Sequence, residues 1–94
     1  MITSTRITVG TEPVKLVPSH HMNTRVKLLN AGGEVVRIGG SSDVSATSAF
    51  GLPRLPDSPN VTRNSFDFTL SPGEEIWAVV SANTSEVNVW YQVT

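Results

Sequence analysis

Residues 34–53, EVVRIGGSSDVSATSAFGLP, change character halfway along. The stretch opens with a run of valine and isoleucine, which is typical of a β-strand. Paired glycines, Gly39 and Gly40, interrupt this run, and small residues follow without any periodicity. We therefore predict a strand that ends at the glycines and leads into a loop reaching residue 63. A loop of this length in a small domain is usually functional, disordered, or the site of a further short element, for which residues 44–47 are the candidate.

The sequence before this stretch predicts its partner strand. In residues 24–30, TRVKLLN, Val26 and Leu28 share one face, while charged residues occupy the other. The following Asn-Ala-Gly-Gly segment contains residues that tolerate a turn. We therefore predict a hairpin that pairs residues 24–30 with residues 34–38 through a four-residue connection.

The sequence after the loop repeats strand and turn to the end of the chain. Phe66, Phe68 and Leu70 alternate with polar residues, which predicts a half-buried strand. A Ser-Pro-Gly-Glu turn follows, and residues 75–81 then carry apolar side chains on both faces, which indicates a central or covered strand. After a turn at residues 82–85, residues 86–93 alternate again.

The N-terminal part predicts edge elements. Residues 2–9 are rich in threonine and alternate, which favours an exposed or edge strand, with an extended arm over residues 1–12 as the alternative. Prolines bracket residues 13–18 and restrict them to an edge or a short bridge, and we predict a short strand there. No window has the spacing of an amphipathic helix. We predict one all-β domain over residues 1–94, a small antiparallel β-sandwich or jelly-roll-like barrel of about six to eight short strands.

Composition and charge disfavour two classes of binding partner, nucleic acids and membranes. The chain has 94 residues and a net charge of -1, and it has no basic run that would bind a nucleic acid. No apolar run is long enough to cross a bilayer and no secretory signal opens the chain, so we expect a soluble protein made in the cytoplasm. Because there are no cysteines to supply disulfides, we expect such a small core to be stabilised by oligomerisation.

The candidate catalytic and metal-binding residues lack the spacing and the partners of a known site. His20 and His21 are adjacent and would point to opposite sides of a strand, which disfavours a shared metal ion. The Gly-Gly-Ser-Ser segment at residues 39–42 lacks the lysine and helix of a phosphate-binding loop. The acidic candidates for a carboxylate pair are Asp57, Asp67, Glu74 and Glu75. We interpret Glu74 and Glu75 as part of a solvated turn, and we expect no enzyme activity, cofactor or metal.

Three aromatic residues near the C-terminus, Trp77, Trp90 and Tyr91, allow two interpretations. Aromatic rings bind sugar rings well, so these side chains are a possible glycan platform. Large aromatic residues also pack in cores and at subunit interfaces, which is the more common role.

Several segments resemble one known group of proteins. They are VRIGGS at residues 36–41, DVSAT at 43–47, FGLP at 50–53 and LSPGEEIWAV at 70–79. In order and spacing these segments resemble small β-rich virion structural proteins of tailed bacteriophages, over roughly residues 24–93. The chain departs from that pattern at residues 54–64, which lengthen the loop before the phenylalanine strand.

The resemblance implies a capsid decoration or minor capsid protein. Such a protein binds the outside of the phage shell, commonly as a homotrimer, contacts the major capsid protein and stabilises contacts between capsomers. Its location would be the capsid surface of the virion, after synthesis in the host cytoplasm. The residues expected at protein interfaces are Ile2, Ile7, Val44, Phe50, Leu52, Leu55 and Trp77.

Two alternatives remain open. The first is a tail, baseplate or head-fibre module that binds a host-surface glycan through its aromatic residues. The second is a small hydrolase or metal-dependent enzyme, which needs a carboxylate pair or a bound metal.

Overall fold

The computed structural model describes residues 2–45, 51–52 and 65–93, and all regular elements in these residues are strands. The strands are β1 (Ile2–Val9), β2 (Val14–Val17), β3 (Thr24–Asn30), β4 (Val36–Gly39), β5 (Gly51–Leu52), β6 (Ser65–Leu70), β7 (Ile76–Val79) and β8 (Ser85–Val93).

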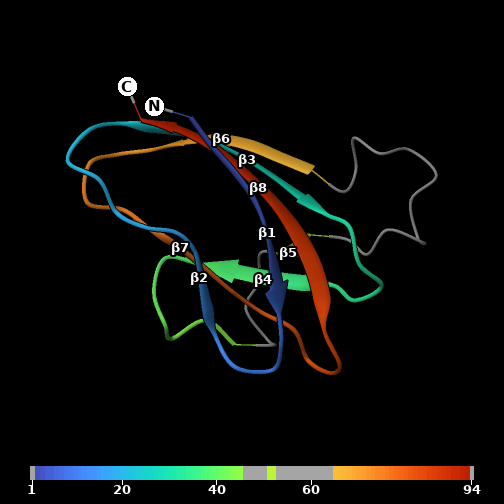
Figure 1. The fold of residues 1–94 in the computed structure, drawn as a ribbon. Coiled ribbons are helices and arrows are strands. Elements are labelled where there is room, and N and C mark those ends of the chain that lie inside the picture. The colour runs from blue at the N-terminus through green and yellow to red at the C-terminus, as the bar shows by residue number, and fades with distance from the viewer. Residues whose placement is uncertain (1, 46–50, 53–64, 94) are drawn as a thin grey trace.

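The strands form two four-stranded antiparallel sheets that pack face to face (Figure 1). Sheet A has the order β1-β8-β3-β6, and sheet B has the order β2-β7-β4-β5. The chain therefore moves repeatedly from one sheet to the other, and the first and last strands pair side by side. This order is that of an eight-stranded jelly roll. The predicted small antiparallel β-sandwich is thus confirmed.

The hairpin predicted for residues 24–38 is wrong. β3 lies between β8 and β6 in sheet A, whereas β4 lies between β7 and β5 in sheet B. The reason is a corner organised by Asn30, which is fully buried. Its Nδ2 donates a hydrogen bond to the carbonyl oxygen of Glu34 at 2.7 Å, so the connection turns towards the second sheet and does not fold back on β3.

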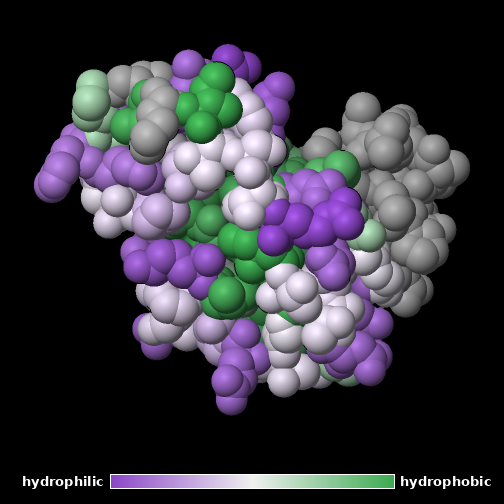
Figure 2. Space-filling view, in the orientation of Figure 1, coloured by the Kyte–Doolittle hydropathy of each residue, from purple (hydrophilic) through white to green (hydrophobic). Residues whose placement is uncertain are grey.

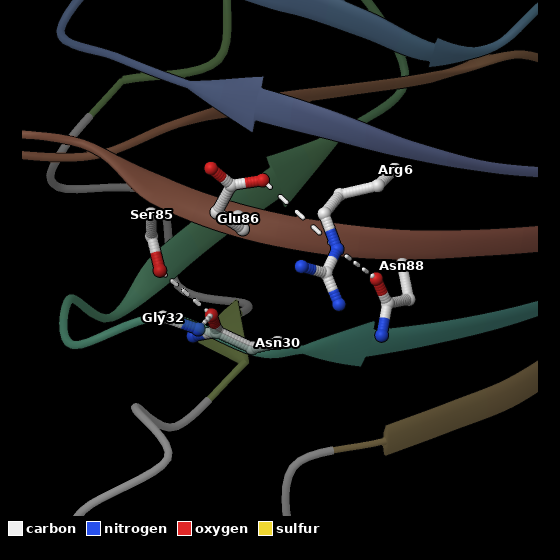
Figure 3. Close-up of polar contacts among 6 residues, drawn as sticks. All are labelled: Arg6, Asn30, Gly32, Ser85, Glu86 and Asn88. Atoms are coloured by element: carbon white, nitrogen blue, oxygen red, sulfur yellow. Dashed lines mark hydrogen bonds and ion pairs between the residues drawn. The ribbon is translucent and has the colours of Figure 1, made fainter.

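The same asparagine joins this corner to the last strand (Figure 3). Its Oδ1 accepts hydrogen bonds from the backbone N–H of Gly32 at 3.1 Å and from the hydroxyl of Ser85 at 2.8 Å. The backbone N–H of Ala31 also donates to the carbonyl oxygen of Glu86 at 2.8 Å. These bonds satisfy polar groups that would otherwise be buried without partners. The Asn-Ala-Gly-Gly segment is therefore a crossing between sheets.

The core lies between the sheets and is built mainly of valine, leucine and isoleucine. Its buried members are Val9, Leu16, Val17, Val26, Leu28, Val36, Ile38, Leu70, Ile76, Ala78, Val80, Val87 and Val89. In β2 the register shifts between Lys15 and Val17, so Leu16 and Val17 both reach the core although they are consecutive. β7 is a central strand with apolar residues on both faces, as its sequence predicts.

Most of the other predicted elements are also confirmed. The threonine-rich stretch at the N-terminus is β1, which lies at the edge of sheet A and pairs with β8 along its whole length, so it is no arm separate from the sheet. The proline-bracketed segment is β2, at the edge of sheet B. The predicted turns contain Gly73 and Asn83, which have positive φ values of 86° and 60°. Of the short element expected at residues 44–47, Val44 and Ser45 belong to no strand, and the other two lie outside the described residues.

Candidate interaction surfaces

The outer face of sheet B carries Trp77 in a closed set of contacts with Lys15 and Glu75. The indole N–H of Trp77 donates to Oε1 of Glu75 at 2.8 Å, and the Lys15 ammonium lies 3.2 Å from Oε2. The same ammonium lies 5.4 Å from the centre of the Trp77 ring. These contacts arise because Lys15 and Trp77 are register partners on β2 and β7. The polar edge of Trp77 is thus occupied within its own molecule.

This set of contacts changes the acidity of Glu75. The hydrogen bond from Trp77, followed by the hydrogen bond from Lys15, lowers the pKa of the Glu75 carboxyl from its ordinary value. Both donors stabilise the ionised carboxylate and have less to bind when it is protonated. Glu75 is therefore a negatively charged anchor for Trp77 at neutral pH.

The outer face of sheet A is a polar surface with Trp90 near its centre. Trp90 is half-buried, and its register partners are Ser4 on β1 and Lys27 on β3. The Lys27 ammonium lies 5.7 Å from the centre of the ring, close enough for a cation–π contact. A tryptophan among hydrogen-bonding side chains is the arrangement that the glycan interpretation needs.

The other charges on this face are paired. Arg6 donates to Oδ1 of Asn88 at 2.8 Å and lies 4.0 Å from the Glu86 carboxylate (Figure 3). Arg25 lies 3.9 Å from the carboxylate of Asp67 on β6. These side chains are largely exposed, so the pairs contribute little to stability. They mix both signs of charge across the face.

Two large apolar side chains are prominently exposed at one end of sheet A. Ile2 is 58% exposed and Met22 is 54% exposed. Ile2 pairs with Gln92, and Met22 comes two residues before Thr24, which pairs with Val93, so both lie where β8 ends. Both chain ends lie at this end in Figure 1, and Figure 2 shows hydrophobic atoms there. We call Ile2 and Met22 the apolar end.

The residues expected at interfaces are dispersed over the fold. Ile7 is half-buried and packs against the core, and Trp77 is held by Glu75. Val44 is 8% exposed and lies beside Gly39, where a β-carbon would come within 3.2 Å of its side chain. Leu52 belongs to β5 and pairs with Val36. The two remaining candidates, Phe50 and Leu55, lie outside the described residues.

An apolar groove opens between the sheets on the side of β6. It has a volume of about 350 Å³ and is lined by Ile38, Gly39, Gly40, Phe66, Phe68 and Ile76. Its lining is almost free of polar groups, so hydrogen bonds to a ligand would be scarce. Figure 2 shows a further strip of hydrophobic atoms in the middle of the view, with polar atoms on both sides.

The candidate catalytic residues have other contacts. Glu74 accepts a hydrogen bond from the Ser71 backbone N–H at 2.6 Å and so closes its own turn. His20 lies against Tyr91, with ring centres 5.6 Å apart. Within the described ranges, no group of three or more His, Cys, Asp or Glu residues is placed to hold a metal ion. The same ranges contain no helix that is long and apolar enough to span a membrane.

Two features were missed in the sequence: the exposure of Met22, and the placing of Trp90 beside Lys27. Methionine is among the residues most often buried, so nothing in the sequence marks Met22 as exposed. The Trp90 contact depends on the register between β3 and β8, which follows from the long-range pairing of strands.

No protein-family model matches the chain, and no curated protein matches its sequence. Among solved structures, it is similar to the nucleoplasmin-like N-terminal domain of Drosophila FKBP39, with 10% identity and a TM-score of 0.49. The alignment covers 100% of this chain and 91% of that one.

Proposed function

We propose that this chain is a capsid decoration or minor capsid protein of a tailed bacteriophage. It binds the major capsid protein on the outside of the shell as a homotrimer and stabilises the contacts between capsomers. Its role is structural, and it involves neither nucleic acid nor membrane. The resemblance over residues 24–93 supports this role. The jelly-roll fold is compatible with it, since viral capsid domains are one of the classes that use this fold.

The observation that carries the proposal is the apolar end. Full burial of an isoleucine or methionine side chain contributes about 1.5–3 kcal/mol. Ile2 and Met22 each expose more than half of their surface, so most of this free energy is available to a partner. Because both lie at the same end of sheet A, one contact surface on a partner can cover them together.

The mechanism is mechanical. A trimer uses two different surfaces of each subunit for its internal contacts, and it leaves one equivalent end of every subunit for the shell. Three apolar ends on one trimer then bind neighbouring capsomers at once. Detachment requires all three contacts to break, so the bound trimer resists outward pressure better than a single subunit would.

The direct test is to image purified virions and identify their proteins by mass spectrometry. We expect many copies of this protein in regular positions on the outer surface of the capsid. Intact virions without the protein, or copies confined to the tail, would overturn the proposal.

A second test addresses the apolar end on shells that lack the protein. Ile2→Asp and Met22→Asp should each weaken binding to such shells at least tenfold, because a carboxylate resists transfer to an apolar contact. Thr11→Asp is the control, since Thr11 is exposed in the turn after β1, at the opposite end of that strand. Equal binding by all three variants would exclude the apolar end as the contact.

The glycan-binding module stays the second candidate, because the outer face of sheet A places Trp90 among polar side chains. Trp77 is the matched control, since its indole N–H already donates to Glu75. If this function is correct, Trp90→Ala abolishes saturable binding to host polysaccharide, whereas Trp77→Ala retains it. An absence of saturable binding by the unmodified protein would reject this candidate.

A further inference from the structure

The four edge strands in the described part of the sandwich, β1, β6, β2 and β5, differ in how well they are protected from pairing with another chain. An edge strand presents unpaired backbone N–H and C=O groups, and proteins usually shield such edges with prolines, charges, bulges or short strands. β2 has four residues, prolines on both sides, Lys15 and a register shift. β5 has two residues. β6 has six residues and carries one charge, Asp67, which lies 3.9 Å from Arg25 on its own sheet.

β1 has almost none of these protections. It is eight residues long, contains no proline or glycine, and keeps a continuous register with β8. Arg6 is its only charged residue, and the ionic contact of Arg6 is with Glu86 on its own sheet. The other side of β1 has no strand beside it in the described part of the chain. β1 thus carries one charge in eight residues, against one in six for β6, and it offers the longest run of unpaired backbone groups to another strand.

The inner face of β1 is also incompletely covered. Thr3, Thr5 and Ile7 face inward with Tyr91, Val89 and Val87 of β8. However, Thr5 is exposed, and Thr3 and Ile7 are only half-buried. The strand opposite in the other sheet, β2, has only four residues. A further strand beside β1 would cover these inward-facing side chains as well as the unpaired backbone groups.

We propose that β1 pairs with β1 of a second copy of this chain, antiparallel and around a twofold axis, so that the two sheets A become one continuous sheet. Such an isologous contact uses the same surface twice. A threefold ring cannot be closed by it, so the contact lies between trimers where trimers exist. The pairing does not depend on the shell.

The register of this pairing follows from the side chains. In an antiparallel pair, residues directly opposite each other lie on the same face of the sheet. A twofold axis perpendicular to the sheet must therefore lie midway between the two copies of one residue. An axis at Arg6 would place two guanidinium groups directly opposite each other, which is destabilising. An axis at Ser4 would leave three residues of β1, Ile7, Thr8 and Val9, without partners in the strand. An axis at Thr5 keeps the two guanidinium groups apart and leaves only Val9 without a partner.

With the axis at Thr5, the strand is complementary to itself. Thr5 lies opposite its own copy, a threonine pair of the kind that stabilises antiparallel sheets. Ser4 then lies opposite Arg6 of the second copy, and Ile2 lies opposite Thr8. A second copy can pair with this edge because Arg6, the one charged residue of β1, lies opposite a serine and not opposite its own copy. The surface area buried by one strand pair is small compared with the roughly 1,000 Å² buried in a stable interface. We therefore expect a weak contact that forms at high local concentration.

The absence of cysteine gives a clean test, because any introduced cysteine is the sole thiol of the chain. Thr5→Cys should form a disulfide-linked dimer under mild oxidation, since opposed residues of an antiparallel pair lie within disulfide range. Thr69→Cys is the matched control: Thr69 is also an exposed threonine, on β6 at the other edge of sheet A. We expect Thr5→Cys to cross-link at least ten times faster. Equal rates, or no cross-link at Thr5→Cys, would overturn the proposal.

A mixing experiment tests the register. Ser4→Cys and Arg6→Cys, mixed in equal amounts and oxidised, should give mainly the mixed dimer, whereas each variant alone should cross-link slowly. A random distribution of the three dimers would contradict the register. Adding Thr5→Lys to both chains should suppress the mixed dimer, because it places two ammonium groups across the axis, while Thr69→Lys should not. These results are independent of virion imaging, so either proposal can fail alone.

Discussion

Gly32 shows at the scale of one residue why the chain crosses between sheets where it does. A β-carbon at this position would overlap the Ser85 hydroxyl and would lie 2.8 Å from the backbone nitrogen of Glu86. The glycine therefore allows the crossing to pass against the start of β8. Its neighbour Gly33 has open space around it, since a β-carbon there would meet no atom within 4 Å.

Gly32→Ala should lower the free energy of unfolding by about 1–3 kcal/mol, the usual cost of overpacking. Gly33→Ala should be neutral or slightly stabilising, because neither steric overlap nor a positive φ opposes it. Urea denaturation of both variants measures the difference. Equal stability of the two would show that the crossing tolerates a side chain at Gly32.

Glu75 predicts a pH dependence at the same scale. Its pKa is lowered in the folded protein, so the unfolded chain binds protons more readily at this residue. The stabilisation is therefore present at neutral pH and is lost as the pH falls through the lowered pKa of the folded state. Glu75→Gln should show a smaller loss of stability between pH 7 and acidic pH than the unmodified chain, by urea denaturation. An unchanged acid dependence would show that the contacts with Trp77 and Lys15 do not stabilise the fold.

At the scale of elements, two consecutive leucines of β3 point to opposite faces of sheet A, one to the core and one to solvent. Leu28 is 1% exposed in the core, whereas Leu29 faces outward and is half-buried. Leu28→Ala should cost about 2–5 kcal/mol, because it leaves a cavity between the sheets. Leu29→Ala should cost clearly less. Thermal unfolding followed by circular dichroism measures both, and a larger effect at Leu29 would contradict the assigned faces.

At the scale of the whole molecule, the first and last strands are neighbours. Ile2 pairs with Gln92, so the two ends of the chain lie close together (Figure 1). Joining them with a short flexible linker and opening the chain between Thr11 and Glu12 converts β8 and β1 into a hairpin. This circular permutant should keep the native fold and refold faster, because its central pairing becomes local.

Circular dichroism and stopped-flow refolding measure these two properties. Opening the chain between Val89 and Trp90 is the control, since it cuts β8, which pairs with both β1 and β3. We expect that control to remain unfolded. A folded control, or an unfolded permutant opened at Thr11, would contradict the central role of β8.

Local patterns in the sequence were enough to predict the class of the fold and most of its strands. The alternation of Phe66, Phe68 and Leu70, the two-faced apolar pattern of β7 and the Pro-Gly turn each report local geometry, because strand periodicity and turn chemistry depend on neighbouring residues. Threonine content predicted an exposed or edge position for β1, and prolines that cannot donate to a ladder predicted an edge or a short bridge for β2. Both strands lie at edges.

Which strands pair is a property of the tertiary structure alone. Local spacing favoured a hairpin between β3 and β4, yet the buried side chain of Asn30 binds Ser85 and sends the chain to the other sheet. Near the end of residues 34–53, β5 and its pairing with β4 were likewise not predicted. The apolar end, the Lys27–Trp90 contact and the open edge of β1 all depend on partners distant in the sequence, and no local pattern records those partners.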